Sequence, residues 1–280
     1  MAVALISGAS TGIGRATSLR LAASGWTVLA GVRKSEDGEK LVAAGGEQIV
    51  PVMLDVTDAE QIAQAAERVD ELAGASGLDA LINNAGIGVG GPLELIAVED
   101  FRRQLEVSVI GHVAVTQALL PALRRARGRG RIVFVSSVGG RVALPLSAPY
   151  AASKHAIEAI ADALRGELRS SRVKVVLVEP GSVATPIWGK TGAEAEQMKI
   201  PPELHAQYGH VPEAFAKTLR EVDSRGIPPE RVAETIERAL TAARPRARYL
   251  VGRDAWAMVL GHAVLPTWVF DRVLRRALGI

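Results

Sequence analysis

A glycine-rich segment close to the start of the chain restricts the folds that this sequence can adopt. Residues 8–14 read Gly-Ala-Ser-Thr-Gly-Ile-Gly, and they follow directly on the apolar run 3–7. Residues 11–24 then show the pattern of a helix that ends at Gly25. The segment therefore predicts a buried strand, a tight turn and the first turn of a helix. The unpaired N–H groups of such a helix start attract phosphate.

The rest of the chain alternates apolar runs of strand length with amphipathic segments of helix length. This order is typical of a doubly wound α/β fold, because parallel strands need a crossover connection that is usually a helix. Several runs are continuous in Val, Ile and Leu, as in strands covered on both faces. We predict a single domain, residues 1–280, with a Rossmann-type parallel sheet of seven strands. The predicted strands are residues 3–7, 27–32, 48–53, 80–83, 131–136, 174–179 and 248–251.

Three further helices are expected at residues 58–73, 99–127 and 149–171. Asp58 is the predicted N-cap of the first, and Gln61 is its capping-box partner three residues later. Ser147 is the predicted cap of the third, because Pro149 fits the first turn of a helix.

Two segments near the end of the chain lie outside this regular pattern. Residues 185–226 are rich in Pro, Gly and polar residues but carry scattered large apolar side chains, so we predict a substrate lid, with a structural loop as the alternative. Residues 254–280 have apolar positions at helical spacing and predict a C-terminal apolar helix. That helix is expected to pack on the domain or a partner subunit. Covering a lipophilic substrate, or contact with a membrane surface, is the less favoured alternative.

Composition and charge argue against several classes of function. The chain has no cysteine, and its five histidines do not stand at metal-ligand spacing with carboxylates, so we expect no metal site. A net charge of +3 is small for a nucleic-acid binder, and we interpret the basic run 124–131 as a solvated helix end and turn. No signal peptide is recognised. The one membrane candidate, residues 255–270, is shorter than the ~20 residues of a spanning helix, so we expect a cytoplasmic protein.

The residues after the second predicted strand indicate which dinucleotide fits. An acidic residue at that strand end would bind the adenosine ribose and repel a 2′-phosphate. Here Gly31 and Val32 occupy the strand end, and Arg33 and Lys34 follow. A guanidinium can hold a phosphate through two hydrogen bonds. We therefore favour NADP(H); NAD(H) remains the alternative, in which both cations are simply solvated.

Ser137, Tyr150 and Lys154 form a set that can transfer a proton. Tyr150 and Lys154 are four positions apart on a predicted helix and so share one face. An ammonium about 4 Å from a phenol, at an effective dielectric near 20, lowers the phenol pKa by up to about three pH units. Ser137 ends the fifth predicted strand, at the edge where doubly wound sheets bind ligands, so its hydroxyl can hold a substrate oxygen.

These motifs occur together with residues 83–86, Asn-Asn-Ala-Gly, and with Pro180-Gly181 followed by Thr185. In their order and spacing, residues 2–250 resemble the short-chain dehydrogenase/reductase family of the single-domain type. Residues 28–34 and the apolar tail are similar to its hydroxysteroid and retinol dehydrogenase branch. The resemblance implies interconversion of an alcohol and its carbonyl compound, with Lys154 also bound to the nicotinamide ribose. It further implies a homodimer or homotetramer. The aliphatic and aromatic side chains of residues 185–226 indicate that the small-molecule substrate is apolar, such as a retinoid, a steroid or a medium-chain carbonyl compound.

The sequence and the resemblance together predict the residues that contact the cofactor. Asp55 is expected to meet adenine, with a capping or turn role as the competing interpretation. The predicted contacts are Gly8, Ser10, Thr11, Gly12, Ile13, Gly14, Arg33, Lys34, Asp55, Val56, Asn84, Ala85, Gly86, Tyr150, Lys154, Pro180, Gly181, Val183 and Thr185.

One candidate catalytic position departs from the family pattern. The family usually has Asn in the middle of the fourth long helix, and this chain has Ser108. The Asn of the family shapes a helix distortion whose main-chain carbonyl holds a water near the lysine. A serine hydroxyl tends to bond back to a carbonyl one turn earlier, although the main-chain carbonyl of residue 108 remains. We expect an active enzyme; the alternative is a nucleotide-binding regulatory or scaffold protein with impaired catalysis.

Overall fold

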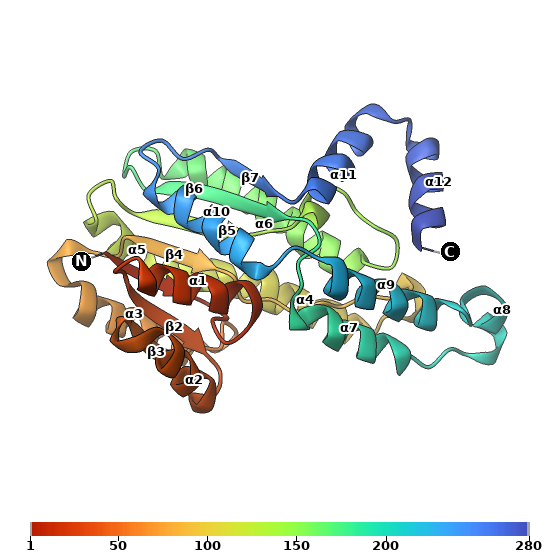
Figure 1. Ribbon diagram of the computed structural model, residues 1–280, viewed down its shortest axis with the longest axis horizontal. Helices are drawn as coiled ribbons and strands as arrows, with labels where there is room; N and C mark the ends of the chain where they lie inside the picture. Colours follow the sequence, from red (N-terminus) through yellow and green to blue (C-terminus); the bar gives the residue numbers. More distant parts are fainter. Residues whose placement is uncertain (1, 279–280) are drawn as a thin grey trace.

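A seven-stranded parallel sheet forms the centre of the molecule, as predicted (Figure 1). The computed structural model describes residues 2–278. Within that range the strand order is β3-β2-β1-β4-β5-β6-β7, and all neighbours run in the same direction. The strands are β1 (Val3–Ile6), β2 (Thr27–Val32), β3 (Ile49–Met53), β4 (Ala80–Asn83), β5 (Arg131–Val135), β6 (Lys174–Pro180) and β7 (Arg248–Val251).

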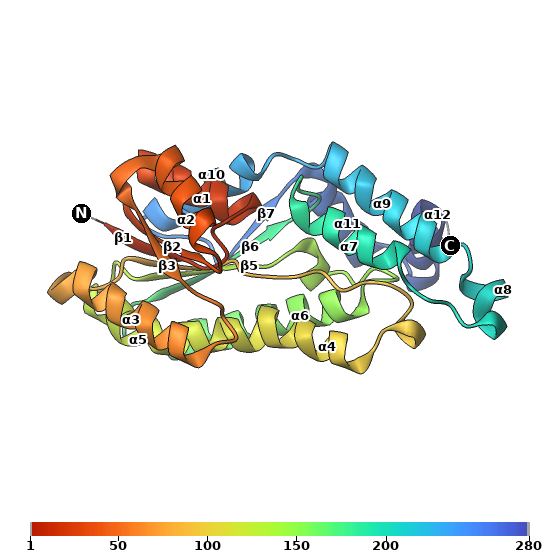
Figure 2. The same ribbon diagram turned by 90° about the horizontal axis from the view of Figure 1, so that it is seen from below.

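Helices cover both faces of the sheet (Figure 2). One face carries α1 (Gly12–Ala23), α2 (Ser35–Gly45) and α10 (Pro229–Thr241); the other carries α3 (Ala59–Ala73), α5 (Gly111–Arg125) and α6 (Ala148–Glu167). Successive side chains of a strand point to opposite faces. Leu5 therefore packs in the core under α3, α5 and α6, whereas Ile6 packs in the core under α1 and α10.

The predicted helix at residues 99–127 runs from Val98 to Arg125 and contains an irregularity. It consists of α4 (Val98–Leu105), a π-helical segment η4 (Glu106–Ile110) and α5. Among the described residues it is also the one helix with the length and composition to cross a membrane, in place of the predicted stretch 255–270. Its buried side packs in the core against the sheet and α6, through residues such as Val115, Leu119 and Leu123, and this packing accounts for part of its apolar composition.

Two helical extensions lie beyond the carboxyl ends of the strands (Figure 1). The predicted lid is largely helical: α7 (Pro186–Glu196) packs against α9 (Val211–Arg225), and the short α8 (His205–Tyr208) lies at the tip. The predicted single apolar tail helix is wrong, because the structure has α11 (Arg253–Val264) and α12 (Thr267–Leu278). Pro266 lies between them, and a proline removes a backbone donor that a continuous helix needs.

Local capping follows the sequence only in part. Asp58 caps α3, where its carboxylate accepts the N–H groups of Glu60 and Gln61. The capping box forms only in part. Gln61 also donates from its side-chain amide to the Asp58 carboxylate at 2.8 Å, but its side-chain oxygen accepts the N–H of Asp55, at 2.8 Å, and not that of Asp58. Ser147 precedes α6, but its hydroxyl donates to Leu144 O and does not cap the helix.

Short 3₁₀ turns are η1 (Gly46–Gln48), η2 (Gly74–Ser76), η3 (Leu93–Leu95), η5 (Val138–Gly140) and η6 (Pro202–Leu204).

Internal contacts occupy much of the basic run 124–131. Arg125 pairs with Asp70, and Arg129 pairs with Asp79 at 2.8 Å. Arg131 is buried and donates to three carbonyl oxygens of residues 128–130. These arginines therefore hold the turn before β5 together.

Candidate active site

The glycine turn between β1 and α1 has the conformation that its sequence predicts. Gly8 and Gly12 adopt φ of +65° and +54°, a region that L side chains rarely enter. A Cβ at Gly14 would lie 2.2 Å from Gly8 O, so α1 approaches the strand end too closely for any side chain there. The side chain of Thr11 makes no cap at the start of α1. The first N–H groups of α1 are therefore free of a side-chain cap, as a phosphate site requires.

The turn after β4 is tied to the glycine turn. The Asn84 side chain donates to Ser7 O and Gly8 O, both at 3.0 Å. The Ser7 hydroxyl accepts the N–H groups of Asn84 and Ala85 at 3.0 and 3.1 Å. His112 of α5 completes the arrangement, because its Nε2 lies 2.6 Å from Ala85 O and donates to it. Residues 84–86 thus form one rigid edge of the predicted cofactor-binding cradle, whose other edge is the glycine turn at residues 8–14.

His112 supports the turn at residues 84–86, a role that the sequence does not predict. Its side chain is fully buried, and burial together with the charge of Lys154 lowers its pKa to about 3. The ring is therefore neutral at physiological pH and carries its proton on the nitrogen that faces Ala85. Its role is to hold the residue 84–86 turn in place, and nothing in the local sequence marked it.

The cations and the acid of the predicted adenosine end differ in their surroundings. Among the described residues, neither Arg33 nor Lys34 has an ion-pair partner, and both are exposed. The Asp55 carboxylate accepts the N–H and the hydroxyl of Thr57 at 3.0 and 2.8 Å. The competing turn role of Asp55 is therefore present in the structure.

Ser137, Tyr150 and Lys154 come together at the carboxyl end of β5. Tyr150 and Lys154 lie on α6, and Ser137 begins the turn η5 directly after the strand. The Lys154 ammonium donates to Val135 O at 2.9 Å and lies 5.7 Å from the centre of the Tyr150 ring. The Ser137 hydroxyl accepts the N–H of Gly139 at 3.0 Å and hydrogen-bonds to Tyr150.

The protonation state of Tyr150 differs from the expectation. We predicted that Lys154 would lower the phenol pKa, but burial dominates and raises it, with the Ser137 hydrogen bond lowering it only in part. Burial also lowers the pKa of Lys154 to about 8, while the nearby Glu158 carboxylate works in the opposite direction. At neutral pH the site therefore holds a protonated phenol and a charged lysine, which suits a proton donor.

The segment predicted as a lid contacts the proton-transfer set. The indole of Trp188, on α7, meets the Tyr150 ring edge to face with 5.9 Å between centroids. Its N–H donates to Val183 O at 2.9 Å, which fixes the indole over the tyrosine. Trp188 also packs with Leu146 against Phe215 of α9. The lid thus places one large apolar side chain, the indole of Trp188, against the Tyr150 ring.

The turn after β6 depends on a residue from the tail. A Cβ at Gly181 would lie 2.4 Å from a carboxylate oxygen of Asp254, at the start of α11. That carboxylate accepts the N–H of Ser182 at 2.6 Å. Thr185 lies next to the glycine turn, because a Cβ at Gly12 would be 3.1 Å from its Cγ2. Asp254 therefore shapes the turn that carries the predicted cofactor contacts Pro180 and Gly181, and no local motif signals this contact.

Ser108 occupies the π-helical segment η4 and is fully buried. The expected bond from its hydroxyl to a carbonyl one turn earlier does not occur within the described residues. Instead, the hydroxyl accepts a hydrogen bond from the side-chain amide of Gln104 at 3.0 Å. The same amide donates to Ser153 at 3.1 Å, and its oxygen accepts the N–H of Val89. The distortion of the helix is thus present with serine in place of asparagine.

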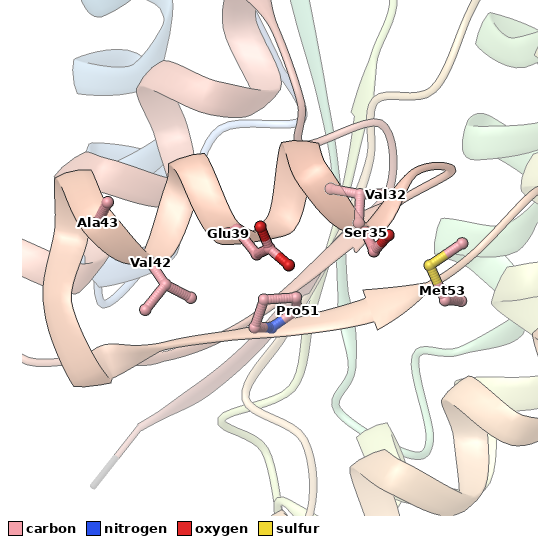
Figure 3. A pocket seen from close by; sticks show the side chains of 7 residues that line it. All are labelled: Val32, Ser35, Glu39, Val42, Ala43, Pro51 and Met53. Carbon is pink, nitrogen blue, oxygen red and sulfur yellow. The ribbon is translucent and has the colours of Figure 1, made fainter.

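A separate surface cavity of about 560 Å³ lies between α2 and the edge strand β3 (Figure 3). Its lining is mainly apolar and contains none of the residues of the proton-transfer set. The residues that line it are Val32, Ser35, Glu39, Val42, Ala43, Pro51 and Met53.

The residues present fit a nicotinamide dinucleotide. The glycine turn leaves a space that a Cβ would fill, α1 begins there without a side-chain cap, and the proton-transfer set lies farther along the same sheet edge. Within the described residues no cluster of side chains could hold a metal ion. The site thus combines a phosphate-binding end with a proton-donating end.

Comparison with known proteins agrees with this geometry. The family model described as short chain dehydrogenase matches residues 2–196. An NADPH-dependent 3-dehydrocapnine reductase of Ornithobacterium rhinotracheale is 34% identical, over 99% of this chain and 98% of its own length. Mouse retinol dehydrogenase 5 is 38% identical, over 96% of this chain and 86% of its own.

A solved structure extends the likeness to the cofactor-bound state. A short-chain dehydrogenase from Burkholderia cenocepacia in complex with NADP superimposes with a TM-score of 0.72 at 29% identity, covering 99% of this chain and 97% of its own. The match spans the glycine turn, the sheet and the proton-transfer set alike. This chain belongs to the short-chain dehydrogenase family.

Proposed function

We propose that this protein is an NADP(H)-preferring oxidoreductase that interconverts an alcohol and its carbonyl compound on an apolar substrate. The observation that carries the proposal is the meeting of Ser137, Tyr150 and Lys154 at the sheet edge that also carries the glycine turn. The test is NADPH consumption by the purified protein over a panel of aldehydes and ketones that includes retinal and a ketosteroid. Binding of NADPH without turnover across that panel would instead favour the scaffold alternative.

The chain's own residues divide the chemistry between them. A nicotinamide cofactor, when bound, would supply or accept the hydride. Ser137 holds the substrate oxygen, and Tyr150 donates a proton to that oxygen in the reductive direction. The raised pKa of Tyr150 keeps the phenol protonated for this step. Lys154 stabilises the phenolate that remains, and it binds the nicotinamide ribose as its family counterpart does.

The preference for NADP(H) has two supports. The 34% identical reductase is named as NADPH-dependent, and Arg33 is an exposed cation without an ion-pair partner in the described chain. We expect Arg33→Ala to lower kcat/KM for NADPH by about 10- to 100-fold, because hydrogen bonds to charged groups contribute about 1.5–3 kcal/mol. The value for NADH should change little. Arg68→Ala, which removes an exposed arginine on α3, is the control. An equal loss with both cofactors would argue against a 2′-phosphate contact.

The pH dependence should report Lys154. Its pKa is lowered to about 8, so the ammonium loses its proton as pH rises through that value. We therefore expect kcat/KM for NADPH, which reflects ionisations of the free enzyme, to fall about tenfold per pH unit above about pH 8. Steady-state rates between pH 6 and 10 measure this. A profile that stays flat to pH 10 would show that the charge of Lys154 is not needed.

An apolar substrate is supported by the lid. Trp188 contacts the Tyr150 ring, and it packs with Leu146 against Phe215 of the lid. Mouse retinol dehydrogenase 5 and bovine 17-beta-hydroxysteroid dehydrogenase type 6 are among the relatives, at 38% and 36% identity. We therefore propose a retinoid, a steroid or a medium-chain carbonyl compound as the class of substrate.

Turnover is favoured over a purely regulatory role by the surroundings of Ser108. Gln104 holds the serine hydroxyl, and the π-helical segment that exposes main-chain carbonyls is present. The carbonyl of residue 108 can therefore serve a proton relay without an asparagine. We also propose a homodimer or homotetramer, because Val98 and Ile110 are exposed on the long helix α4–α5. Light scattering on the purified protein tests the oligomeric state.

A further inference from the structure

A cluster of buried charges lies one helical turn beyond Lys154. Glu158 follows Lys154 by four positions on α6, and its side chain is 8% exposed. Glu179, near the end of β6, has a fully buried side chain. Arg248 of β7 donates from Nε to a Glu158 oxygen at 3.0 Å, and this nitrogen lies 3.1 Å from Glu179 Oε1. Arg141 reaches the other Glu179 oxygen at 3.5 Å.

Two carboxylate oxygens in this cluster accept no hydrogen bond within the described residues. Glu158 Oε1 and Glu179 Oε1 are both buried, and neither has a hydrogen-bond partner among the described residues. The Arg248 N–H that lies near Glu179 is directed at Glu158 instead. One proton shared by the two carboxyls would satisfy both groups, because a protonated carboxyl donates while a carboxylate accepts. Burial and the charge of Glu158 raise the pKa of Glu179 to about 7, which agrees with such sharing.

The cluster is packed directly against the proposed active site. A Cβ at Gly140, in the turn η5 that follows Ser137, would lie 3.0 Å from Glu158 Cγ and 3.0 Å from Lys154 O. The same Cβ would lie 2.8 Å from the Ser136 hydroxyl, a third buried group without a partner in the described chain. Glycine at this position lets the turn lie flat on Glu158. The cluster therefore adjoins both Lys154 and the turn that carries Ser137.

We propose that Glu158 is a positioning residue that keeps Lys154 charged, and that Glu179 adjusts the charge of Glu158 by sharing one proton with it. This inference rests on the proposed function, in which Lys154 acts as a cation. Glu158 is the carboxylate whose charge favours the ammonium of Lys154. Neither glutamate touches the substrate or the reacting atoms.

The charges around the cluster determine the direction in which the glutamate pair shifts the pKa of Lys154. Two arginines lie next to the glutamates: Arg141 pairs with Glu179, and Arg248 pairs with Glu158, Glu179 and Asp162. The groups next to Lys154 are Tyr150 and the neutral His112. As pH rises through about 7, the glutamate pair loses its shared proton and becomes more negative. That added charge favours the ammonium of Lys154 just as the solution begins to deprotonate it. The pair thus extends the pH range over which Lys154 remains a cation.

The test measures the charge of Lys154 directly. The chain has seven lysines, so ¹³C-labelled lysine Cε signals can be titrated by NMR, with Lys154→Met identifying the signal of interest. We expect Glu158→Gln to move the Lys154 titration about one pH unit lower, a tenfold change in its charged fraction at a fixed pH above the midpoint. Glu179→Gln should move it lower by a smaller amount, because Glu158 keeps its charge while the charge that the pair gains above about pH 7 is lost.

Asp162→Asn is the matched control. Asp162 lies one turn farther along α6 and binds the same Arg248, but its side chain is 42% exposed. This variant should leave the Lys154 titration unchanged. An unmoved titration in Glu158→Gln would overturn the proposal, as would an equal downward shift in both glutamine variants. The NMR readout needs no turnover, so an inactive wild type would count against the proposed function and not against this inference.

The pH–rate profile supplies a second readout. In an active protein, Glu158→Gln should move the alkaline limb of kcat/KM for NADPH to lower pH by the same amount as the NMR titration. A uniform loss of rate at every pH, with the limb in its wild-type position, would show that Glu158 has only a structural role. A circular dichroism melt of each variant identifies those that fail to fold, and Glu158→Asp then provides a charge-preserving replacement.

Discussion

Tyr150→Phe is expected to lower kcat for carbonyl reduction by about 10³-fold, within the range that general acid catalysis contributes. The substitution removes one hydroxyl and leaves the ring in its contact with Trp188. The protein should therefore fold and bind NADPH as the wild type does, since the glycine turn is untouched. Stopped-flow or steady-state NADPH oxidation measures the rate, and quenching of protein fluorescence measures binding.

The matched control for this variant is Tyr249→Phe. Tyr249 lies on β7, where its hydroxyl accepts the N–H of Arg246 and makes no contact with the proton-transfer set. We expect wild-type rates from it. Activity that survives in Tyr150→Phe would mean that another group supplies the proton, and the assignment of Tyr150 would be wrong.

Gly14→Ala is expected to weaken NADPH binding at least tenfold and to lower the free energy of unfolding by about 2–3 kcal/mol, the usual cost of forcing extra atoms into a packed site. The added Cβ would lie 2.2 Å from Gly8 O and 2.6 Å from the Asn84 amide nitrogen. Both atoms belong to the cradle, so α1 or the turn must move. Isothermal titration calorimetry and urea unfolding measure the two effects.

Gly166→Ala provides the comparison for a glycine in a helix. Gly166 lies near the end of α6, and a Cβ there meets no atom within 4 Å. Alanine should stabilise the protein by up to about 1 kcal/mol, because it restricts the unfolded chain. If Gly14→Ala behaved like Gly166→Ala, the close approach of α1 to the strand end would not matter for binding.

The sheet and the location of the site were predictable from the sequence. Three strands, β2, β4 and β7, begin and end at the predicted residues. For β2 and β4 the reason is that continuous apolar runs bounded by turn residues define buried strands. The positions of Tyr150 and Lys154 on one helix face also follow from sequence spacing. The helices α2 and α10 were not assigned, and the lid was expected to be irregular. In α7 and α9, packing between the two helices outweighs the Pro, Gly and polar content of the local sequence.

The electrostatics of the site were less predictable. The sequence places a lysine near a tyrosine, which favours a low phenol pKa, yet burial raises it. The supporting contacts of Gln104, Asp254 and Arg248 likewise join residues that are far apart in the sequence. No periodicity or motif encodes such pairs.

The sequence by itself determined the parallel sheet, the phosphate-binding turn and the side chains available for proton transfer. These depend on local periodicity, on the conformational freedom of glycine and on the chemistry of individual residues. Only the tertiary structure decided how far each group is buried, that Trp188 covers Tyr150 and that Glu158 and Glu179 meet beneath Lys154. The physical reason is that desolvation and charge pairing depend on distances between elements, and the folded chain alone fixes those distances.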